Sequence, residues 1–496
     1  MQDYFDALRR SATGLPDKEA LAFHQDDTVT SVSWGQLWQD VERAALAPDA
    51  SRPGDLEFIA SRTGYASILA YLAALRNDAH PAYLAPLTPR QDSQIYHAEL
   101  ALLIERFRPN RVIAETVAGT RRHGDPFPAG HEPGFVQFSS GTTGLRKGVL
   151  ISERQLLAQL AALGETLGIG PDDRIACWLP LYHDMGLVTS LLMPLYFGAS
   201  VSFLDPVAWS FRPESLPALI ARDRATLCWQ PDFAFRHIAN RYARSDGLPD
   251  ARLDSLRLLV NCSEPCRTRT FVEFWRAFRH RGLREDALQV SYAMAENVFA
   301  VTQTRFDGER SWTRHPEFLS SGTPVPGCAV RIAGAASGEG PGEIEVQSDF
   351  LFDGYLGRPT DPDRLAGGCF RTGDLGVLRD GELYVVGRQD DTLIVNGRKI
   401  LAHQIEDHFG LLPGVRPGRV LCVAPGDGSA IDILYEGDEL APPVQRQVRT
   451  WCGTAAGVSV NQIRRLEPGT IVKSSSGKLA RAKSIEKLSR LNLLPQ

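Results

Sequence analysis

The chain has 496 residues, which is more than one compact core usually supports, so we expect two or three domains. Hydrophobic residues make up 43% of the chain and charged residues 23%, a composition that excludes a disordered or fibrous protein. The formal net charge of -5 provides no basic footprint for a nucleic acid, and no nucleic-acid partner is expected.

Polar and apolar patterning predicts a cytoplasmic location. The start, MQDYFDALRRSATG, is too polar for a signal peptide. The most apolar stretch, 187–204, is interrupted by Pro194 and Gly198 and is shorter than a comfortable membrane span, so we expect a buried helix and a buried strand there. The eight cysteines are scattered, and the closest pair, Cys262 and Cys266, lacks the further ligands of a zinc site. Buried, reduced thiols are therefore expected.

From about residue 148, short β-rich runs alternate with segments of helical spacing. Such alternation predicts an α/β fold with a parallel or mixed sheet whose ligands bind beyond the carboxyl ends of the strands. The stripe Leu156, Leu160, Leu163 and Leu167 indicates one of the helices. The predicted strands are 148–152, 174–180, 200–205, 225–230, 256–262 and 288–294, with further helices after Pro231 and around 271–278.

The pattern changes after about residue 320. Gly and Pro become dense, and strands are predicted in pairs, at 342–347 and at 377–387, the latter with a DG turn at Asp380–Gly381. This indicates a small antiparallel subdomain. A polar stretch, GRQDD (387–391), then leads to about a hundred residues that look like a separate compact unit.

Residues 138–148 read FSSGTTGLRKG and join two predicted strands. Hydroxyls and backbone N–H groups in such a run can hold an anion, glycine lets the backbone approach closely, and Lys147 adds a positive charge. Alone, the run is as often a polar hairpin loop. It is not the P-loop of kinases and GTPases, because Gly141 is followed by TTGLRKG rather than by GK at that motif's spacing.

Two further motifs follow predicted strands. WLPLYHDMGL (178–187) contains His183 and Asp184, and SYAMAE (291–296) places Tyr292 before small residues and Glu296. A His–Asp pair alone is more often a helix cap than a catalytic pair, and the second motif alone is more often an exposed cap. The functional alternatives are catalysis for the first motif, and base stacking and metal binding for the second.

Three polar motifs follow in the last third of the chain. FRTGD (370–374) puts Asp374 on a tight turn, where a carboxylate can accept two hydrogen bonds from a diol. GRQDDTLIVNGRK (387–399) begins with Arg388 followed by acids. SSSGKLARAK (474–483) places Lys478 after a flexible stretch; a lysine there is usually a solvated charge, but it can also reach into a site built elsewhere.

In this order and spacing, the motifs resemble those of the adenylate-forming superfamily, which includes acyl-CoA synthetases, peptide-synthetase adenylation domains, luciferases and fatty acyl-AMP ligases. The matching segments are the phosphate loop SSGTTGLRKG, the adenine motif NCSEP (261–265), SYAMAE, FRTGD, the hinge GRQDD and the lysine motif SSSGK. The resemblance covers nearly the whole chain. WLPLYHDMGL, WQPDFAF (229–235) and NCSEP resemble the fatty acyl-AMP ligases most. Ser139 replaces that branch's usual Thr, Ala293 its usual Gly, and its typical insertion before the ribose motif is missing.

The resemblance implies a large N-terminal domain, 1–387, of mixed sheets with covering helices and a small antiparallel subdomain. A hinge at 388–391 connects it to a small, mobile α+β domain, 392–496, that carries Lys478. The implied reaction is attack of a carboxylate on the α-phosphorus of ATP with release of pyrophosphate, followed by transfer of the acyl group to a thiol.

The resemblance also assigns roles to residues. Lys478, Glu296 and His183 are the implied catalytic residues, with Glu296 as the ligand of Mg²⁺. The C-terminal domain is implied to rotate about Asp390 and to open a thiol tunnel beside Gly397. The acyl pocket is expected at His183, Asp184, Gly186, Trp229, Phe233 and Phe235, although the aromatic residues among them are equally compatible with core packing. The expected ATP- and AMP-binding residues are Ser139, Ser140, Gly141, Thr142, Thr143, Gly144, Lys147, Ser263, Glu264, Pro265, Tyr292, Ala293, Asp374 and Arg388.

These expectations leave several functions open. The first is activation of a hydrophobic, fatty or related acid for the phosphopantetheine thiol of an acyl carrier protein. The missing insertion, which in that branch is thought to restrain the C-terminal domain, leaves free CoA as the alternative acceptor. An inactive binding homologue is disfavoured by Glu296, Asp374, Arg388 and Lys478, and an oxidoreductase of luciferase type is the remaining alternative.

Overall fold

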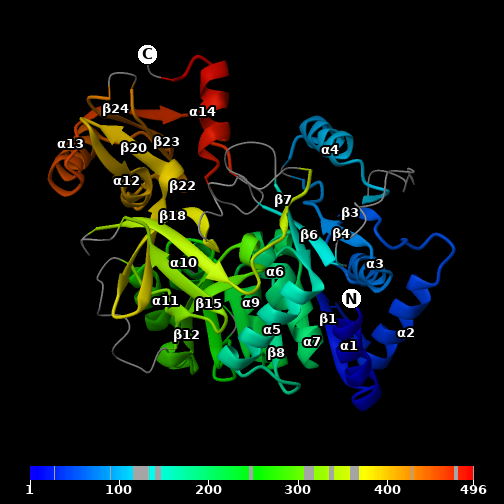
Figure 1. Ribbon diagram of the computed structural model, residues 1–496. Helices are drawn as coiled ribbons and strands as arrows, with labels where there is room; N and C mark the ends of the chain where they lie inside the picture. Colours follow the sequence, from blue (N-terminus) through cyan, green and yellow to red (C-terminus); the bar gives the residue numbers. More distant parts are fainter. Residues whose placement is uncertain are drawn as a thin grey trace.

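The computed structural model describes most of the chain. The described residues are 1–26, 28–89, 91–114, 132, 134–139, 147–244, 248, 250–305, 318–334, 340–357, 368–425, 428–473 and 479–494. Figure 1 shows a large body, in which the N-terminus lies, and a smaller C-terminal lobe that lies against one side of it.

A nine-stranded sheet forms the centre of the large body, in the order β14-β13-β12-β11-β10-β8-β9-β1-β2. The six neighbouring strands from β12 to β1 are parallel, whereas β2, β13 and β14 are antiparallel to their neighbours. This confirms the predicted α/β class. The strands are β1 (Glu19–Gln25), β2 (Thr28–Ser33), β8 (Arg174–Cys177), β9 (Ser200–Leu204), β10 (Leu227–Gln230), β11 (Leu258–Cys262), β12 (Leu288–Ala293), β13 (Ala300–Gln303) and β14 (Thr323–Pro324).

Amphipathic helices cover this sheet. The predicted leucine stripe lies on α5 (Glu153–Leu167), where all four leucines are buried and Ser152 caps the helix by accepting a hydrogen bond from Gln155 N. The other helices here are α1 (Gln2–Gly14), α2 (Trp34–Ala45), α6 (Asp184–Leu187), η1 (Val188–Leu192), α7 (Met193–Phe197), α8 (Pro206–Phe211), α9 (Ser215–Asp223), α10 (Asp232–Arg244), α11 (Thr268–Phe278), η2 (Arg279–Arg281) and η3 (Glu285–Ala287).

Most of the apolar stretch 187–204 is buried, as predicted. It forms the end of α6, then η1 and α7, and finally β9. Among the helices that the structure describes, none is long and apolar enough to cross a membrane.

One predicted strand belongs to a different sheet from the one expected. Residues 148–152 form β7 (Gly148–Ser152), which pairs antiparallel with β6 (Gly134–Phe138) and with β17 (Gly354–Tyr355). The connection from β6 to β7 is too short for the crossover that a parallel pair needs, so the two strands form a hairpin. A second small sheet of parallel strands lies beside it: β3 (Leu56–Ala60), β4 (His80–Tyr83) and β5 (Arg111–Ala114), with α3 (Tyr65–Arg76) and α4 (Ser93–Phe107).

The predicted antiparallel subdomain is a four-stranded sheet in the order β15-β16-β18-β19. Asp380 and Gly381 have φ values of 51° and 78°, the left-handed conformation that a tight DG hairpin turn requires. The strands are β15 (Cys328–Ile332), β16 (Gly342–Ser348), β18 (Phe370–Arg379) and β19 (Glu382–Arg388).

The C-terminal part of the chain has hydrophobic clusters of its own, which lie within 393–494. It follows the short helix η6 (Gln389–Asp391), at the position of the predicted hinge; the domain boundaries themselves stay predictions. Its elements are β20 (Thr392–Val395), β21 (Arg398–Leu401), α12 (Ala402–Phe409), β22 (Val415–Val423), β23 (Ile431–Gly437), α13 (Pro442–Trp451), η7 (Cys452–Ala456), β24 (Val460–Leu466) and α14 (Arg481–Arg490).

A buried ion pair connects α14 to the rest of this unit. Arg481 donates to both carboxylate oxygens of Glu406, at 2.7 and 2.8 Å, and to the backbone oxygen of Cys422 at 2.8 Å. Removing one member of a buried pair leaves an unpaired charge, so we expect Arg481→Met to cost about 3–5 kcal/mol of unfolding free energy. Chemical denaturation will measure this cost. The matched variant Arg490→Met, on the exposed face of the same helix, should change stability by less than about 1 kcal/mol.

Candidate functional site

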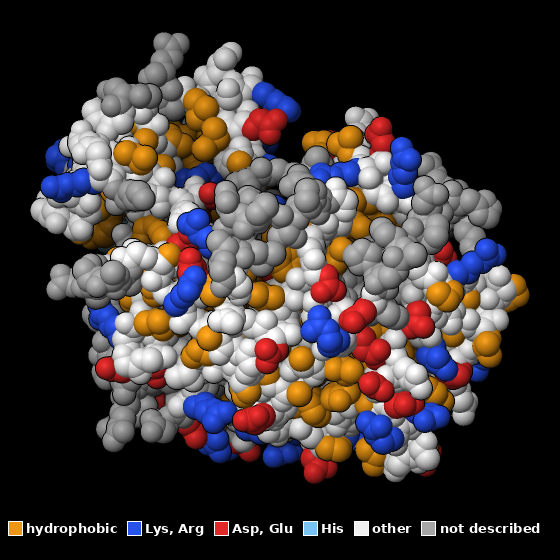
Figure 2. All heavy atoms as spheres, viewed as in Figure 1, with side chains coloured by type: hydrophobic (Ala, Val, Ile, Leu, Met, Phe, Trp, Pro, Cys, Tyr) orange, Lys and Arg blue, Asp and Glu red, His pale blue; other side chains and the backbone are white. Residues whose placement is uncertain are grey.

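A cleft of about 2660 Å³ lies between the large body and the C-terminal lobe. Figure 2 shows the lobe separated by a notch from the part of the body that carries α4. The predicted site residues that line the cleft come from the large body and from the hinge: Ser139, Lys147, His183, Asp184, Phe233, Ser263, Glu264, Pro265, Tyr292, Ala293, Glu296, Asp374, Arg388 and Asp390. Motifs that are far apart in the sequence therefore meet in one place.

Asp374 is the centre of a polar cluster in this cleft. The Tyr292 hydroxyl donates to Oδ2 of Asp374 at 2.6 Å, and Nε of Arg388 donates to Oδ1 at 2.7 Å. The Asp374 carboxylate raises the pKa of Arg388, and burial raises the pKa of Tyr292 well above its ordinary value. Each carboxylate oxygen can accept a second hydrogen bond, so the cluster can receive a diol without losing either partner.

Glu296 lies on the short helix η4 (Ala295–Asn297), immediately after β12. Its Oε1 accepts a hydrogen bond from the Tyr355 hydroxyl at 2.8 Å. The turn that follows is strained, because the β-branched Val298 has a φ of 60° and Phe299 N donates to Asn297 O at 2.6 Å. Such strain persists only where the surroundings hold the backbone, and here they hold Glu296 at the edge of the cleft.

Glu296 fits the role of a magnesium ligand. In the part of the chain that the structure describes, no three metal-binding side chains gather at one point. Mg²⁺ on a nucleotide keeps several waters and uses one or two carboxylates plus the phosphates, so a single carboxylate at the cleft is a suitable protein ligand.

The predicted phosphate loop is described only at its ends. Ser139 N donates to Lys147 O at 2.9 Å, which closes the hairpin between β6 and β7. The Lys147 ammonium lies 5.1 Å from the centre of the Tyr355 ring, the same tyrosine that binds Glu296. Ser140, Gly141, Thr142, Thr143 and Gly144 lie outside the described residues.

The adenine motif also has a strained backbone and a polar anchor. Ser263 has a φ of 73°. Its neighbour Glu264 accepts a hydrogen bond from Phe233 N at 3.1 Å and thereby joins the motif to the start of α10. Behind this contact, Asp232 is buried and accepts from Asn261 at 2.9 Å, and burial raises its pKa.

His183 and Asp184 begin α6 at the carboxyl end of β8. Gln137 Nε2 donates to Tyr182 O at 2.9 Å, so this segment is bonded to the strand that leads into the phosphate loop. Gly186 does not line the cleft. A Cβ there would lie 2.3 Å from Pro180 O, so glycine is required for the close approach of α6 to the preceding turn.

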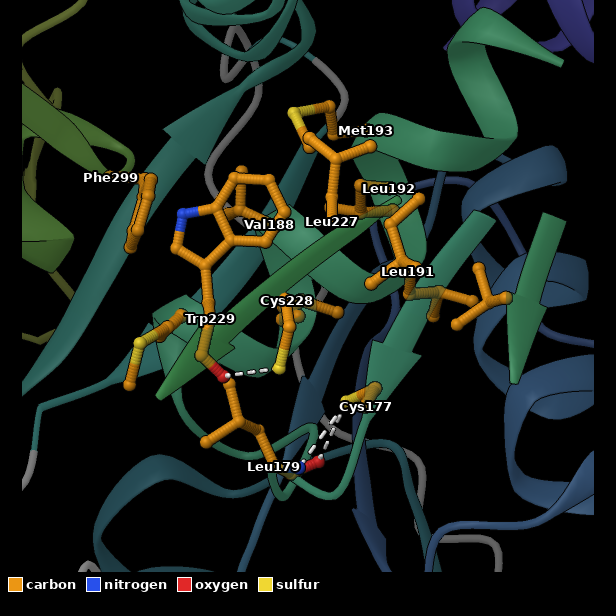
Figure 3. Close-up of a cluster of buried hydrophobic side chains, with 14 of the residues drawn as sticks. Cys177, Leu179, Val188, Leu191, Leu192, Met193, Leu227, Cys228, Trp229 and Phe299 are labelled. Atoms are coloured by element: carbon orange, nitrogen blue, oxygen red, sulfur yellow. Dashed lines mark hydrogen bonds between the residues drawn. The ribbon is translucent and has the colours of Figure 1, made fainter. Parts of the chain in front are cut away.

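Of the two alternatives for Trp229 and Phe235, the structure favours core packing. Both side chains are buried in the main hydrophobic core and neither lines the cleft. Figure 3 shows Trp229 on β10 within a cluster of core side chains that includes Val188 and Phe299. Phe233 does line the cleft, together with Trp178, which was not predicted as a site residue.

The C-terminal unit contributes the segment that contains Lys478. Lys478 itself lies outside the described residues. Lys473 and Leu479, on either side of that segment, form an isolated antiparallel bridge, and both line the cleft. Burial lowers the pKa of Lys473. Gly397 occupies the turn between β20 and β21 with a φ of 75° and does not line the cleft.

Comparison with known proteins identifies the family. Residues 8–356 match the AMP-binding enzymes. The chain belongs to this family. The AMP-binding enzyme described here is 26% identical to the medium-chain-fatty-acid–[acyl-carrier-protein] ligase JamA of Moorena producens, over 94% of this chain and 91% of the relative. It is 30% identical to the long-chain-fatty-acid–AMP ligase FadD23 of Mycobacterium tuberculosis, over 72% of this chain and 69% of the relative.

Solved structures share the fold. A fatty acyl-adenylate ligase from a study of E. coli and L. pneumophila enzymes superposes with a TM-score of 0.83 at 24% identity, over 99% of this chain and 98% of that one. The McyG adenylation and carrier didomain with phenylalanyl-adenylate gives a TM-score of 0.80 at 21% identity, over 99% and 83%. The two-part α/β architecture predicted from the motifs is therefore confirmed, and the AMP-binding enzyme is an adenylate-forming ligase by family.

Proposed function

We propose that this AMP-binding enzyme uses ATP to convert a hydrophobic carboxylic acid into acyl-AMP and then transfers the acyl group to the phosphopantetheine thiol of an acyl carrier protein in the cytoplasm. The observation that carries the proposal is the meeting of the Asp374 cluster, Glu296 and the ends of the Lys478 segment in one cleft. Seven of the eight cysteines are buried and all eight are free thiols, which agrees with a reducing compartment.

In the first step, two anions have to meet, because a carboxylate attacks a triphosphate. Positive charge and in-line positioning are therefore the main tasks of the protein. Asp374 and Arg388 hold the ribose, Tyr292 lies against the base, and Lys147 with the phosphate loop takes the departing pyrophosphate. Mg²⁺, held by Glu296 and the phosphates, would neutralise the charge of the phosphate oxygens. Lys478 binds the carboxylate and the α-phosphate.

In the second step, the thiol attacks the acyl carbonyl and AMP leaves. No strong base is required, because the acyl-AMP bond is already activated. Lys478 must withdraw, and we propose that the C-terminal unit rotates about Asp390 to bring Gly397 to the cleft. The contacts to be broken include the Lys483–Glu99 pair at 2.9 Å, whose side chains are 50% and 49% exposed. A pair so exposed contributes about 0–1 kcal/mol and does not prevent rotation.

The carrier protein is favoured as the acceptor by two features. One relative, JamA, is a fatty-acid–[acyl-carrier-protein] ligase. Lys483, Lys487 and Arg490 on α14 also add positive charge to the C-terminal lobe beside Glu486, and complementary charge speeds the encounter with an acidic partner. Free CoA remains the second candidate, since a relative named as a putative fatty-acid–CoA ligase matches this chain at 26% identity and the restraining insertion is missing.

A competition for the thiol acceptor tests the proposal. With preformed acyl-AMP and equal concentrations of holo-carrier and CoA, we expect acyl-carrier as the main product by mass spectrometry. The rate with the carrier should fall as salt rises, because exposed charges are screened beyond about 8 Å at physiological ionic strength. Predominant acyl-CoA would make the protein an acyl-CoA synthetase. Absence of pyrophosphate release with every acid tested would instead favour an inactive binding homologue.

A further inference from the structure

We infer that the acyl side of the cleft takes short, planar aromatic carboxylic acids rather than long-chain fatty acids. The inference rests on the proposed function and specifies its substrate. It comes from a group of packed rings, Trp178, Trp209, Phe233 and His237, which we call the aromatic wall. Trp178, Phe233 and His237 line the cleft, and Trp209 stands behind them with 1% of its surface exposed.

The rings of the aromatic wall are in direct contact. Trp178 and Trp209 are stacked, with centroids 3.4 Å apart and planes 14° apart. The Phe233 ring meets both edge-on, at 6.0 Å from Trp178 and 6.2 Å from Trp209. His237 lies 5.8 Å from Trp209, also edge-on. Rings at these separations leave no gap wide enough for an alkyl chain.

The aromatic wall stands beside the reacting groups. Trp178 directly follows β8 and precedes the segment with His183 and Asp184, which Gln137 holds beside the phosphate loop. Phe233 lies on α10, and its backbone N–H is bonded to Glu264 of the adenine motif. An acid whose carboxylate points at the α-phosphate therefore meets the wall with the other end of its molecule.

A long acyl chain of the substrate could pass the aromatic wall by two routes, and the described residues make both unfavourable. The inward route, between α8 and α10, is filled by Trp209, which contacts both Phe233 and His237 on α10. Deeper in the body, Trp229 and Phe235 belong to a packed core that does not open to the cleft. The outward route follows α10, where the polar side chains of Arg236, Asn240 and Arg244 alternate along the cleft with the short apolar side chains of Ala239 and Ala243. Such a mixed surface covers a long alkyl chain less completely than an apolar channel does.

An aromatic ring suits the space in front of the wall. Ring faces and edges offer the stacked and edge-to-face contacts that aromatic substrates use, and each such pair adds specificity beyond the buried area.

Pyrophosphate release with a panel of acids tests the inference. With benzoate, cinnamate, 4-hydroxycinnamate, octanoate and palmitate, we expect kcat/KM for the aromatic acids to exceed that for palmitate by about tenfold or more, the discrimination that pocket shape provides. Equal or faster activation of palmitate overturns the inference and leaves the proposed function standing. If no acid releases pyrophosphate, the proposed function itself fails.

Trp209→Leu is the decisive variant, with Trp209→Phe as a milder form should the first not fold. Removing the indole opens the space between α8 and α10, so the ratio of palmitate to cinnamate activation should rise about tenfold. Trp275→Leu, on α11 and outside the cleft, is the matched control and should leave that ratio unchanged. An equal loss for every acid in a folded Trp209 variant would mean that the ring is structural only and would overturn the inference.

Discussion

Replacement of Lys478 by alanine should reduce acyl-AMP formation by about 10²–10³-fold, the usual cost of removing one preorganised group that stabilises transition-state charge. The bridge between Lys473 and Leu479 places both ends of this segment at the cleft that also contains the Asp374 cluster. We propose that the Lys478 ammonium contacts the carboxylate and the α-phosphate during attack. Its loss affects the step in which two anions approach each other.

The same variant should transfer the acyl group from supplied acyl-AMP to a thiol at nearly the normal rate, because the ammonium has withdrawn by then. Acyl-AMP formation is measured by pyrophosphate release, and transfer by mass spectrometry of the thioester. Arg446→Ala, an exposed change on α13 of the same unit, is the control and should alter neither step. A Lys478→Ala enzyme that forms acyl-AMP at near the normal rate would show that the assigned role is wrong.

Local sequence patterns predict individual helices and strands better than they predict which strands pair with each other. The strands after residue 170 follow from β-rich runs between helical stripes, and β8 to β12 lie where those runs are. The run 148–152 was equally clear as a strand. The sheet to which it belongs, however, is set by its partners β6, just before it in the sequence, and β17, about 200 residues after it. The residues of the run itself do not specify those partners.

The pairing of Asp374 with Arg388 shows a similar limit. The turn at Asp380–Gly381 sets a register in which Gly376 faces Val385, and that register continued would place residue 387 opposite Asp374. A bulge between Leu375 and Gly376 shifts the register by one residue and brings Arg388 there instead. The motifs predicted both residues, but a bulge is a tertiary feature that neither motif reveals.

Aromatic residues were the least predictable part of the site. Trp229 and Phe233 belong to the same short motif, yet one enters the core and the other lines the cleft. Trp209 lies outside every motif, on a short helix after β9, and it contacts Trp178, which follows β8, and Phe233 on α10. Hydrophobicity indicates that such side chains are buried, but only the assembled sheet determines which of them face a ligand.

Asp374→Ala should weaken ATP binding far more than acid binding. The ribose loses two charge-assisted hydrogen bonds, each contributing about 1.5–3 kcal/mol, so the ATP affinity should fall by about 10²-fold or more. Tyr292→Phe, which removes only the 2.6 Å bond to Asp374 and keeps the carboxylate and the ring, should have a much smaller effect. Calorimetric titration with ATP and with the acid separates the two affinities. If Asp374→Ala binds ATP as tightly as the unaltered enzyme, the ribose does not contact Asp374, and the cluster with Tyr292 and Arg388 serves the architecture of the cleft rather than the nucleotide.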